Sequence, residues 1–285
     1  MKSLLQYISE TLDYGDRLFA DNKLGKSNCY TPFLKNFKKY YKSSEYEENT
    51  EEEQELLDTI IGRVLCYDSE DQMAKYGSYS VHIGGKNFNE ADFRELVKLK
   101  KKFPSILDPS KAMKGGHIYR GMWMSVEDFL KVAAKAKGTW KADLNFGYGL
   151  CYSDLKSPVE IHLDRNRQDK STINSFTTDV FVASQFCDNL TEDASERQFI
   201  DKIVPVVISC KPKMDQVLFN PDFLDDIGGN LSEKEVLYMG DSIVIDKIGV
   251  NDFWQSICCD LLDENEDACR PELRDIFHKI HQDVG

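Results

Sequence analysis

Three short polar signatures follow one another along the chain, each at the edge of an apolar run. They hold one arginine, two hydroxyls and two carboxylates, in that order: Arg120, Ser175 and Thr177, Glu233 and Glu235. A side chain at the end of a strand can reach a site that it shares with neighbouring strands. We therefore expect the three signatures to meet at one cleft.

These residue types suit a particular chemistry. Glu233 and Glu235, at positions i and i+2 of a strand, would share one face and repel each other unless a polar group such as Ser175 held one of them. Arg120 supplies a rigid fork that binds phosphate or carboxylate. Such a set fits an anionic substrate that develops positive charge, as when a ribose loses a glycosidic leaving group and becomes an oxocarbenium ion.

The ordered set Tyr119-Arg120-Gly121, Ser175-Phe176-Thr177-Thr178 and Glu233-Lys234-Glu235 resembles the Arg-Ser-Glu class of mono-ADP-ribosyltransferases. With Ala183 and Phe186 following, the central run looks most like the phage-encoded enzymes of the Mod and Alt type. The resemblance covers residues 115–250. Three motifs in this order are much more specific than any one of them.

The resemblance implies an α+β fold whose core is a split antiparallel β-sandwich, with NAD bound as a substrate in the cleft and no metal. Arg120 would grip the NAD phosphates or ribose, and the backbone of Gly121 would bond the nicotinamide amide. Arg197 would lie in a loop over the phosphates.

The resemblance also implies a division of labour among the remaining site residues. Ser175 would orient Glu235, while Phe176 and Thr177 support the strand geometry. Glu235 would hold the nicotinamide ribose and stabilise the oxocarbenium ion. Glu233 would activate the acceptor, and a glutamate at that place goes with arginine as the acceptor. This is chemically sensible, because a guanidinium is a poor nucleophile until a carboxylate polarises it.

The acceptor-recognition turn would span residues 215–232, with Phe219 and Phe223 as acceptor contacts. A phenylalanine is more often a core residue than a contact of this kind, so packing in the core is the other interpretation. The partners implied are target proteins, acted on in the cytoplasm by a phage- or toxin-type effector.

We predict three regions: a helical N-terminal region over 1–110, the catalytic core over 111–250 and C-terminal helices over 251–285. Apolar spacing predicts helices over 3–20 and 31–42. A third helix is predicted to begin at a capping box over Thr50 to Glu53, with Leu56 and Leu57 turned inward. A fourth is predicted from Asn89 to about Lys102, and its apolar face holds Phe93, Leu96 and Val97.

In the core, strands are predicted over 116–124, 159–163, 172–177, 202–210, 236–239 and 242–248. Ser125 is expected to cap one helix and Asp179 or Thr178 the next. Pro205 indicates that its strand is an edge or carries a bulge. The segment from 215 to 230 is expected to be rich in turns, and helices are expected over 251–262 and 271–282.

Bulk composition limits the alternatives. The chain has 285 residues, 30% of them charged, and a formal net charge of −13, which does not suit broad binding to phosphate backbones. Eight cysteines without a metal-ligand spacing predict reduced thiols in a cytoplasmic protein. No apolar run reaches membrane-spanning length, so no membrane partner is expected.

Three alternatives stay open at this point. The basic segment from Lys35 to Lys42 would favour RNA or DNA as the acceptor, and the same core could instead hydrolyse NAD. A catalytically silent binding or immunity module is the alternative from another class. His278 and His281, at positions i and i+3, lack a third metal ligand nearby and are interpreted as surface or packing residues. His117 and His162 are interpreted as structural residues, with a place in the lining of the cleft as the other interpretation.

Overall fold

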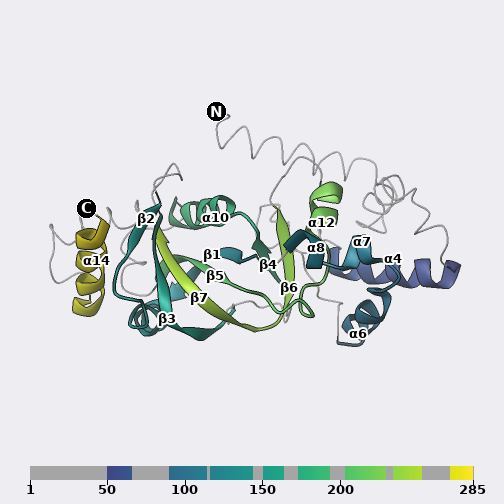
Figure 1. Cartoon of the computed structure of the whole chain (residues 1–285), viewed down its shortest axis with the longest axis horizontal. Helices are drawn as coiled ribbons and strands as arrows, with labels where there is room; N and C mark the ends of the chain where they lie inside the picture. Colours follow the sequence, from purple (N-terminus) through teal and green to yellow (C-terminus); the bar gives the residue numbers. More distant parts are fainter. Residues whose placement is uncertain are drawn as a thin grey trace, which may run out of the picture. The chain divides into compact units, whose positions relative to one another are not determined.

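The computed structural model describes residues 50–65, 90–113, 116–143, 150–163, 173–192, 203–228, 234–251 and 270–284, drawn in colour in Figure 1. By its internal contacts the chain divides into two compact units, one of residues 1–108 and 166–173 and one of residues 109–165 and 174–285. The division after Asp108 lies close to the boundary predicted near residue 110. The helices predicted at 3–20 and 31–42, and residues 252–262 of a third, lie outside the described residues.

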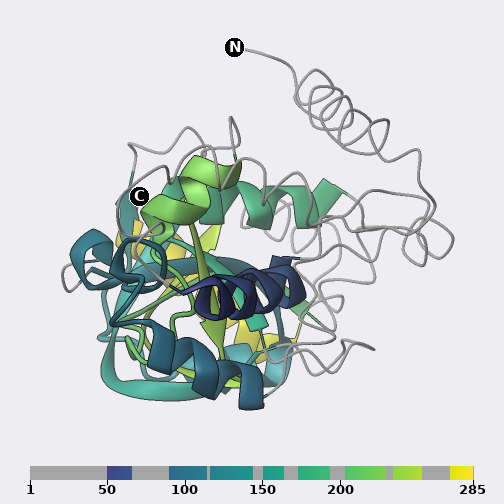
Figure 2. The ribbon, with the colours of Figure 1, turned by 90° about the vertical axis from the view of Figure 1, so that its right-hand side faces the viewer.

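The first unit contains α4 (Glu51–Leu65), α6 (Glu90–Leu99) and α7 (Pro104–Leu107). The start of α4 is as predicted: the Thr50 hydroxyl accepts a hydrogen bond of 3.3 Å from the Glu53 amide, which satisfies one of the unpaired donors of the first turn. Figure 2 shows α4 and α6 side by side. Lys102 also forms an ion pair with Glu53.

Two inward positions were predicted wrongly in these helices. Leu57, Ile60 and Val64 are buried along one stripe of α4, whereas Leu56 is 38% exposed because it lies about 100° round the helix from Leu57. In α6 the buried stripe is Leu96 with Leu99, and Val97 is 48% exposed for the same reason.

The second unit is built on one antiparallel sheet of seven strands in the order β2-β3-β7-β5-β1-β4-β6 (Figure 1). The fold is thus a mixture of helices and antiparallel sheet, as predicted. The strands are β1 (Ile118–Ser125), β2 (Lys141–Asp143), β3 (Leu150–His162), β4 (Ile173–Thr177), β5 (Ile203–Cys210), β6 (Glu235–Met239) and β7 (Ser242–Asn251). The helices are α8 (Ser110–Met113), α9 (Val126–Ala133), α10 (Val180–Glu192), α12 (Pro221–Gly228) and α14 (Pro271–Val284).

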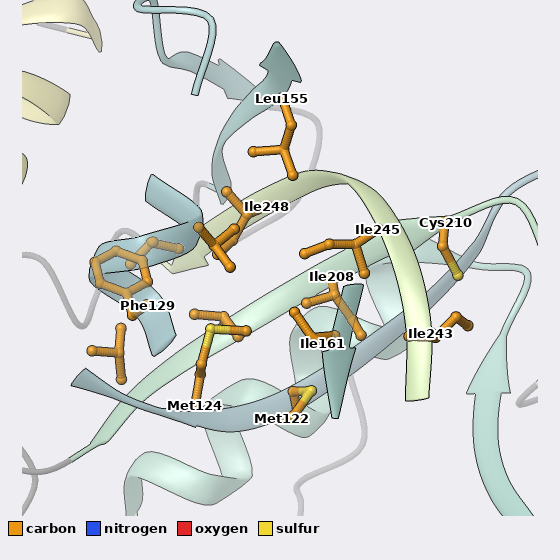
Figure 3. Close-up of a cluster of buried hydrophobic side chains, with 14 of the residues drawn as sticks. Met122, Met124, Phe129, Leu155, Ile161, Ile208, Cys210, Ile243, Ile245 and Ile248 are labelled. Carbon is orange, nitrogen blue, oxygen red and sulfur yellow. The ribbon is translucent and has the colours of Figure 1, made fainter. Parts of the chain in front are cut away.

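One face of the sheet holds the main core. Alternate residues of β1 and β5 point into it, among them Met122, Met124 and Ile208 (Figure 3). Helices α9 and α14 close this core, where Phe129 and Phe277 stack with their ring centroids 6.2 Å apart. Ser125 caps α9 as predicted, its hydroxyl accepting from the Asp128 amide at 3.1 Å.

The opposite face is covered by α10, which lies along β1 and β5 (Figure 1). Ala183 of the helix packs there against Val207 and Leu150, with Tyr119 at the margin. The two faces of β1 therefore serve different layers: Ile118, Met122 and Met124 face the main core, whereas Tyr119 faces α10.

Pro205 does not mark an edge strand, since β5 is central and pairs with both β7 and β1. The pairing with β7 runs from Val206 to Ser209, so Pro205 lies in the part of β5 that is paired with β1 alone. A missing backbone donor is tolerated there because no β7 partner is required.

Two segments are more regular than predicted. The strand expected over 159–163 is the second half of β3, which continues through an irregularity between Asp154 and Val159. The segment expected to be turn-rich contains α12, whose start is capped by Asn220 accepting from the Asp222 amide at 3.1 Å.

Strands β1 and β4 are paired over a very short length. The register that joins these strands is the single pair Tyr119 with Thr177, whereas β1 and β5 are paired over eight positions. Continuing the register would set Gly121 opposite Ser175. There the Arg120 side chain instead donates to the Ser175 carbonyl at 2.6 Å. In place of two separate sheets, the strands form one sheet that is almost divided at this point.

In the described parts of the chain, no helix is long and apolar enough to cross a membrane. Cys151 and Cys210, both buried, are not joined in a disulfide.

The stacked phenylalanines predict a test of the core. Phe277→Ala should lower the free energy of unfolding by about 3–5 kcal/mol, because it opens a cavity beneath α14. Urea denaturation followed by circular dichroism measures it. Phe186→Ala, at a side chain that is 46% exposed on α10, is the control and should change stability by less than about 0.5 kcal/mol. Equal losses in the two variants would contradict this description of the core.

Candidate active site

Arg120, Ser175 and Glu235 come together from three strands. The Arg120 guanidinium donates from Nη1 to the Ser175 carbonyl oxygen at 2.6 Å, and the Ser175 hydroxyl donates to Glu235 Oε1, also at 2.6 Å. They are separated by 55 and 60 positions in the sequence, so only the fold can join them. The arginine, hydroxyl and carboxylate that the sequence placed in one site are in one continuous hydrogen-bonded chain.

The Arg120 side chain packs on Phe176, which forms a pair of aromatic rings with Tyr238. Its guanidinium carbon lies 5.7 Å from the centroid of the Phe176 ring, a cation–π arrangement. Phe176 meets Tyr238 edge to face with centroids 5.8 Å apart, and the Tyr238 hydroxyl donates to Gln216 at 2.6 Å. Burial raises the pKa of Tyr238 to about 12, so the ring remains neutral over the physiological range.

Ser175 is the one exposed residue of β4. Its neighbours Asn174 and Phe176 are buried, and the Asn174 amide donates to the Gly240 carbonyl at 2.7 Å. Ser175 itself is exposed and points away from the core that Phe176 enters. Glu235 is the first residue of β6 and is partly buried, so its carboxylate stands at the rim of the sheet.

The turn after β4 ties this rim to α10. Thr177, which is buried, accepts from the Asp179 amide at 3.0 Å, and Asp179 Oδ1 accepts from the Phe181 amide at 3.0 Å. Asp179 thereby caps α10, as predicted. Its second oxygen, Oδ2, lies 2.9 Å from the Lys234 ammonium. Burial alone would raise the pKa of the Asp179 carboxyl, but the hydrogen bonds from Lys234 and Phe181 lower it below its ordinary value of 3.8.

Lys234, next to Glu235, has a backbone φ of +47°, in the left-handed region. A non-glycine residue pays roughly 1–2 kcal/mol for this conformation, so it persists where surrounding contacts impose it. The Lys234 carbonyl accepts from the Thr178 amide at 3.1 Å, which adds a second tie to the same turn.

The other predicted site residues fall into three groups. Gly121 lies on β1 beside Arg120 and is partly exposed, and Thr177 and Phe176 support the site from within the sheet. Phe219 and Phe223 are 0% and 1% exposed and pack on each other with centroids 6.0 Å apart, so in this structure they are core residues and not surface contacts for an acceptor. Glu233 and Arg197 lie outside the described residues.

Asp179 and Lys234 were not among the predicted site residues. Lys234 stands inside the Glu233-Lys234-Glu235 signature and Asp179 directly follows Thr178, so a pair of opposite charge beside Glu235 and close to Ser175 was the available signal. Their spacing of 55 positions hid the contact, because no local pattern relates residues so far apart.

The described histidines form none of the contacts given above for Arg120, Ser175 and Glu235. His117 forms a 2.8 Å contact with Asp246, whereas His162, His278 and His281 are exposed. Among the described residues, no group of three or more histidine, cysteine or acidic side chains is arranged to hold a metal ion.

Comparison of the chain with protein-family models, with curated proteins and with solved structures finds no match.

The Asp179 charge predicts a pH dependence of stability. Because its pKa is lower in the folded state than in the unfolded chain, the carboxylate stabilises the fold above pH 3.8, and this contribution is lost as the pH falls through the folded-state pKa. Asp179→Asn should therefore be less stable than wild type at pH 7, and the difference should shrink towards zero in acid. Urea titrations at several pH values measure it. A difference that stays constant with pH would show that the charge is not responsible.

Proposed function

We propose that this chain is an NAD-dependent mono-ADP-ribosyltransferase that modifies arginine side chains of target proteins. One observation carries the proposal: the Ser175 hydroxyl holds Glu235 at 2.6 Å while Arg120 binds the carbonyl of the same serine. The first of these contacts is the role that the resemblance to the Arg-Ser-Glu class implies for Ser175, and the second brings Arg120 to the same place.

The geometry of the sheet supports the finer fold assignment, a split ADP-ribosyltransferase core. The β1–β4 junction is a single paired position, and the candidate catalytic residues gather where the ladder stops. The register that pairs β1 with β4 does not extend to Gly121. The backbone polar groups of Gly121 are suited to the nicotinamide amide, and Arg120 beside it is suited to the NAD phosphates or ribose.

Glu235 would act on the ribose of the bound NAD. The bond from the ribose C1′ to the nicotinamide nitrogen breaks, both electrons leave with nicotinamide, and the ribose becomes an oxocarbenium ion. A carboxylate held in place by Ser175 stabilises that positive charge without having to reorganise at the moment of reaction. A nitrogen of the acceptor guanidinium then bonds to C1′ and gives up a proton.

Glu233 would accept the proton that the acceptor guanidinium gives up. The resemblance places it two residues before Glu235 as the group that activates the acceptor, and a carboxylate is a suitable base for a polarised guanidinium. We infer an effector of the phage or toxin type acting in a host cytoplasm, with NAD as the substrate and no metal required.

The first test is transfer itself. Incubation with adenine-labelled NAD and a cell lysate should label proteins, and mass spectrometry should find the ADP-ribose on an arginine nitrogen. Label that nuclease removes would move the acceptor to nucleic acid, and free ADP-ribose alone would indicate NAD hydrolysis. An enzyme that releases no nicotinamide under any of these conditions would leave a binding module and overturn the proposal.

Glu235→Gln should abolish transfer and NAD hydrolysis together, and Ser175→Ala should lower both by about a hundredfold through the loss of an oriented carboxylate. Nicotinamide release measured by chromatography gives the rates. The chain offers a matched control in a second serine–glutamate pair, Ser242 with Glu160 at 2.8 Å on β7 and β3. Ser242→Ala and Glu160→Gln should retain wild-type rates, and equal losses in both pairs would contradict a catalytic role for the first.

Glu233→Gln should abolish transfer to arginine while sparing part of the NAD hydrolysis, because Glu235 still stabilises the ribose cation. The ratio of labelled acceptor to free ADP-ribose is the measurement. If transfer and hydrolysis fell by the same factor, Glu233 would not be the group that serves the acceptor.

A further inference from the structure

The two segments that carry Ser175 and Glu235 are tied together by a second set of contacts that the chemistry above does not use. Lys234 and Asp179 form an ion pair at 2.9 Å, and the Lys234 carbonyl accepts from the Thr178 amide at 3.1 Å. Both contacts join the residue before Glu235 to the turn that follows Ser175. The positions of Glu235 and Ser175 are therefore fixed relative to each other in two ways. One is their own hydrogen bond, and the other is the set of contacts between residues close to them in the sequence.

The backbone conformation of Lys234 links these contacts to the direction of the Glu235 side chain. Its φ of +47° is unfavourable for a residue with a side chain, and a lysine released from its contacts would return to a negative φ. Such a change rotates the chain at the start of β6, where Glu235 is the first strand residue. The direction of the Glu235 side chain thus depends on the conformation of its neighbour.

The Asp179 carboxylate is itself oriented. One oxygen accepts from the Phe181 amide at 3.0 Å, which leaves the other directed at the lysine, and the Asp179 amide is bound to the buried Thr177 hydroxyl at 3.0 Å. The ammonium group therefore meets a fixed partner at the beginning of α10.

We propose that Asp179 and Lys234 are positioning residues, whose ion pair holds residue 234 in the left-handed conformation and so aims Glu235 at the reacting ribose. The proposal rests on the proposed function for its catalytic consequence, but the conformational lock itself does not. The lysine side chain is 48% exposed and the aspartate side chain 30%. A pair this open to solvent adds only a small increment to global stability, which for Asp179→Asn is the pH-dependent loss predicted above, so its main effect should be on the position of Glu235.

Two conservative variants break the pair while keeping the rest of the turn. Asp179→Asn keeps an oxygen that can cap α10, and Lys234→Met keeps the aliphatic stem without the charge. Each should lower kcat for nicotinamide release by about tenfold to a hundredfold, with KM for NAD changed less than about twofold, because Arg120 and Ser175 remain in place. The double variant should be no slower than the slower single variant, since both remove the same interaction.

Two further variants separate the backbone conformation from the charge. Lys234→Gly loses the ammonium but adopts a positive φ without strain, whereas Lys234→Ala loses both. Lys234→Gly should therefore be several-fold faster than Lys234→Ala. Lys131→Met, which removes an exposed lysine paired with Asp128 at 2.9 Å on α9, is the matched control and should leave kcat unchanged.

Amide hydrogen exchange tests the lock without any reference to catalysis. Exchange at the Thr178 amide, followed by NMR, should accelerate in Asp179→Asn and Lys234→Met and stay at the wild-type rate in Lys131→Met. If wild type consumed no NAD, the proposed function would fail, and the exchange rates would still decide whether the pair holds the turn. Wild-type Thr178 exchange in both pair variants would overturn the proposal, as would a reduced kcat with the same values for Lys234→Gly and Lys234→Ala.

Discussion

The structure around the candidate site depends on Ser175, which is hydrogen-bonded through both its backbone carbonyl and its side-chain hydroxyl. Its carbonyl is taken by the Arg120 side chain and its hydroxyl holds Glu235, each at 2.6 Å. A strand residue ordinarily gives its carbonyl to a neighbouring backbone amide. Here a side chain takes this carbonyl instead, next to the single position at which β1 and β4 are paired.

The side chains around Ser175 are supported from both faces of the sheet. On the face of the main core, Phe176 supports the guanidinium and is in turn fixed by Tyr238 and Gln216. On the face of α10, Thr177 and Asp179 fix the turn that follows Ser175. A buried scaffold with one exposed serine is a suitable way to hold a polar site rigidly, because the packed residues permit few alternative rotamers.

Stability and function make different demands on these residues. The stacked pair Phe129 with Phe277 contributes to the core, whereas Ser175 and Lys234 are exposed enough that their polar contacts contribute little to folding. The backbone of Lys234 is even unfavourable by itself. Contacts that stabilise little and a strained residue beside a carboxylate are typical of a site selected for geometry.

The sequence by itself determined most of the elements and three members of the candidate site. Apolar alternation and capping residues such as Thr50, Ser125 and Asp179 are local signals, so the helix starts and most strands could be predicted. Ordered motifs were enough to place Arg120, Ser175 and Glu235 together. Only the tertiary structure decided that Pro205 lies in a central strand, that Phe219 and Phe223 are buried, and that Lys234 meets Asp179. Strand order, burial and pairing across 55 positions depend on which segments pack together, and no local spacing encodes that choice.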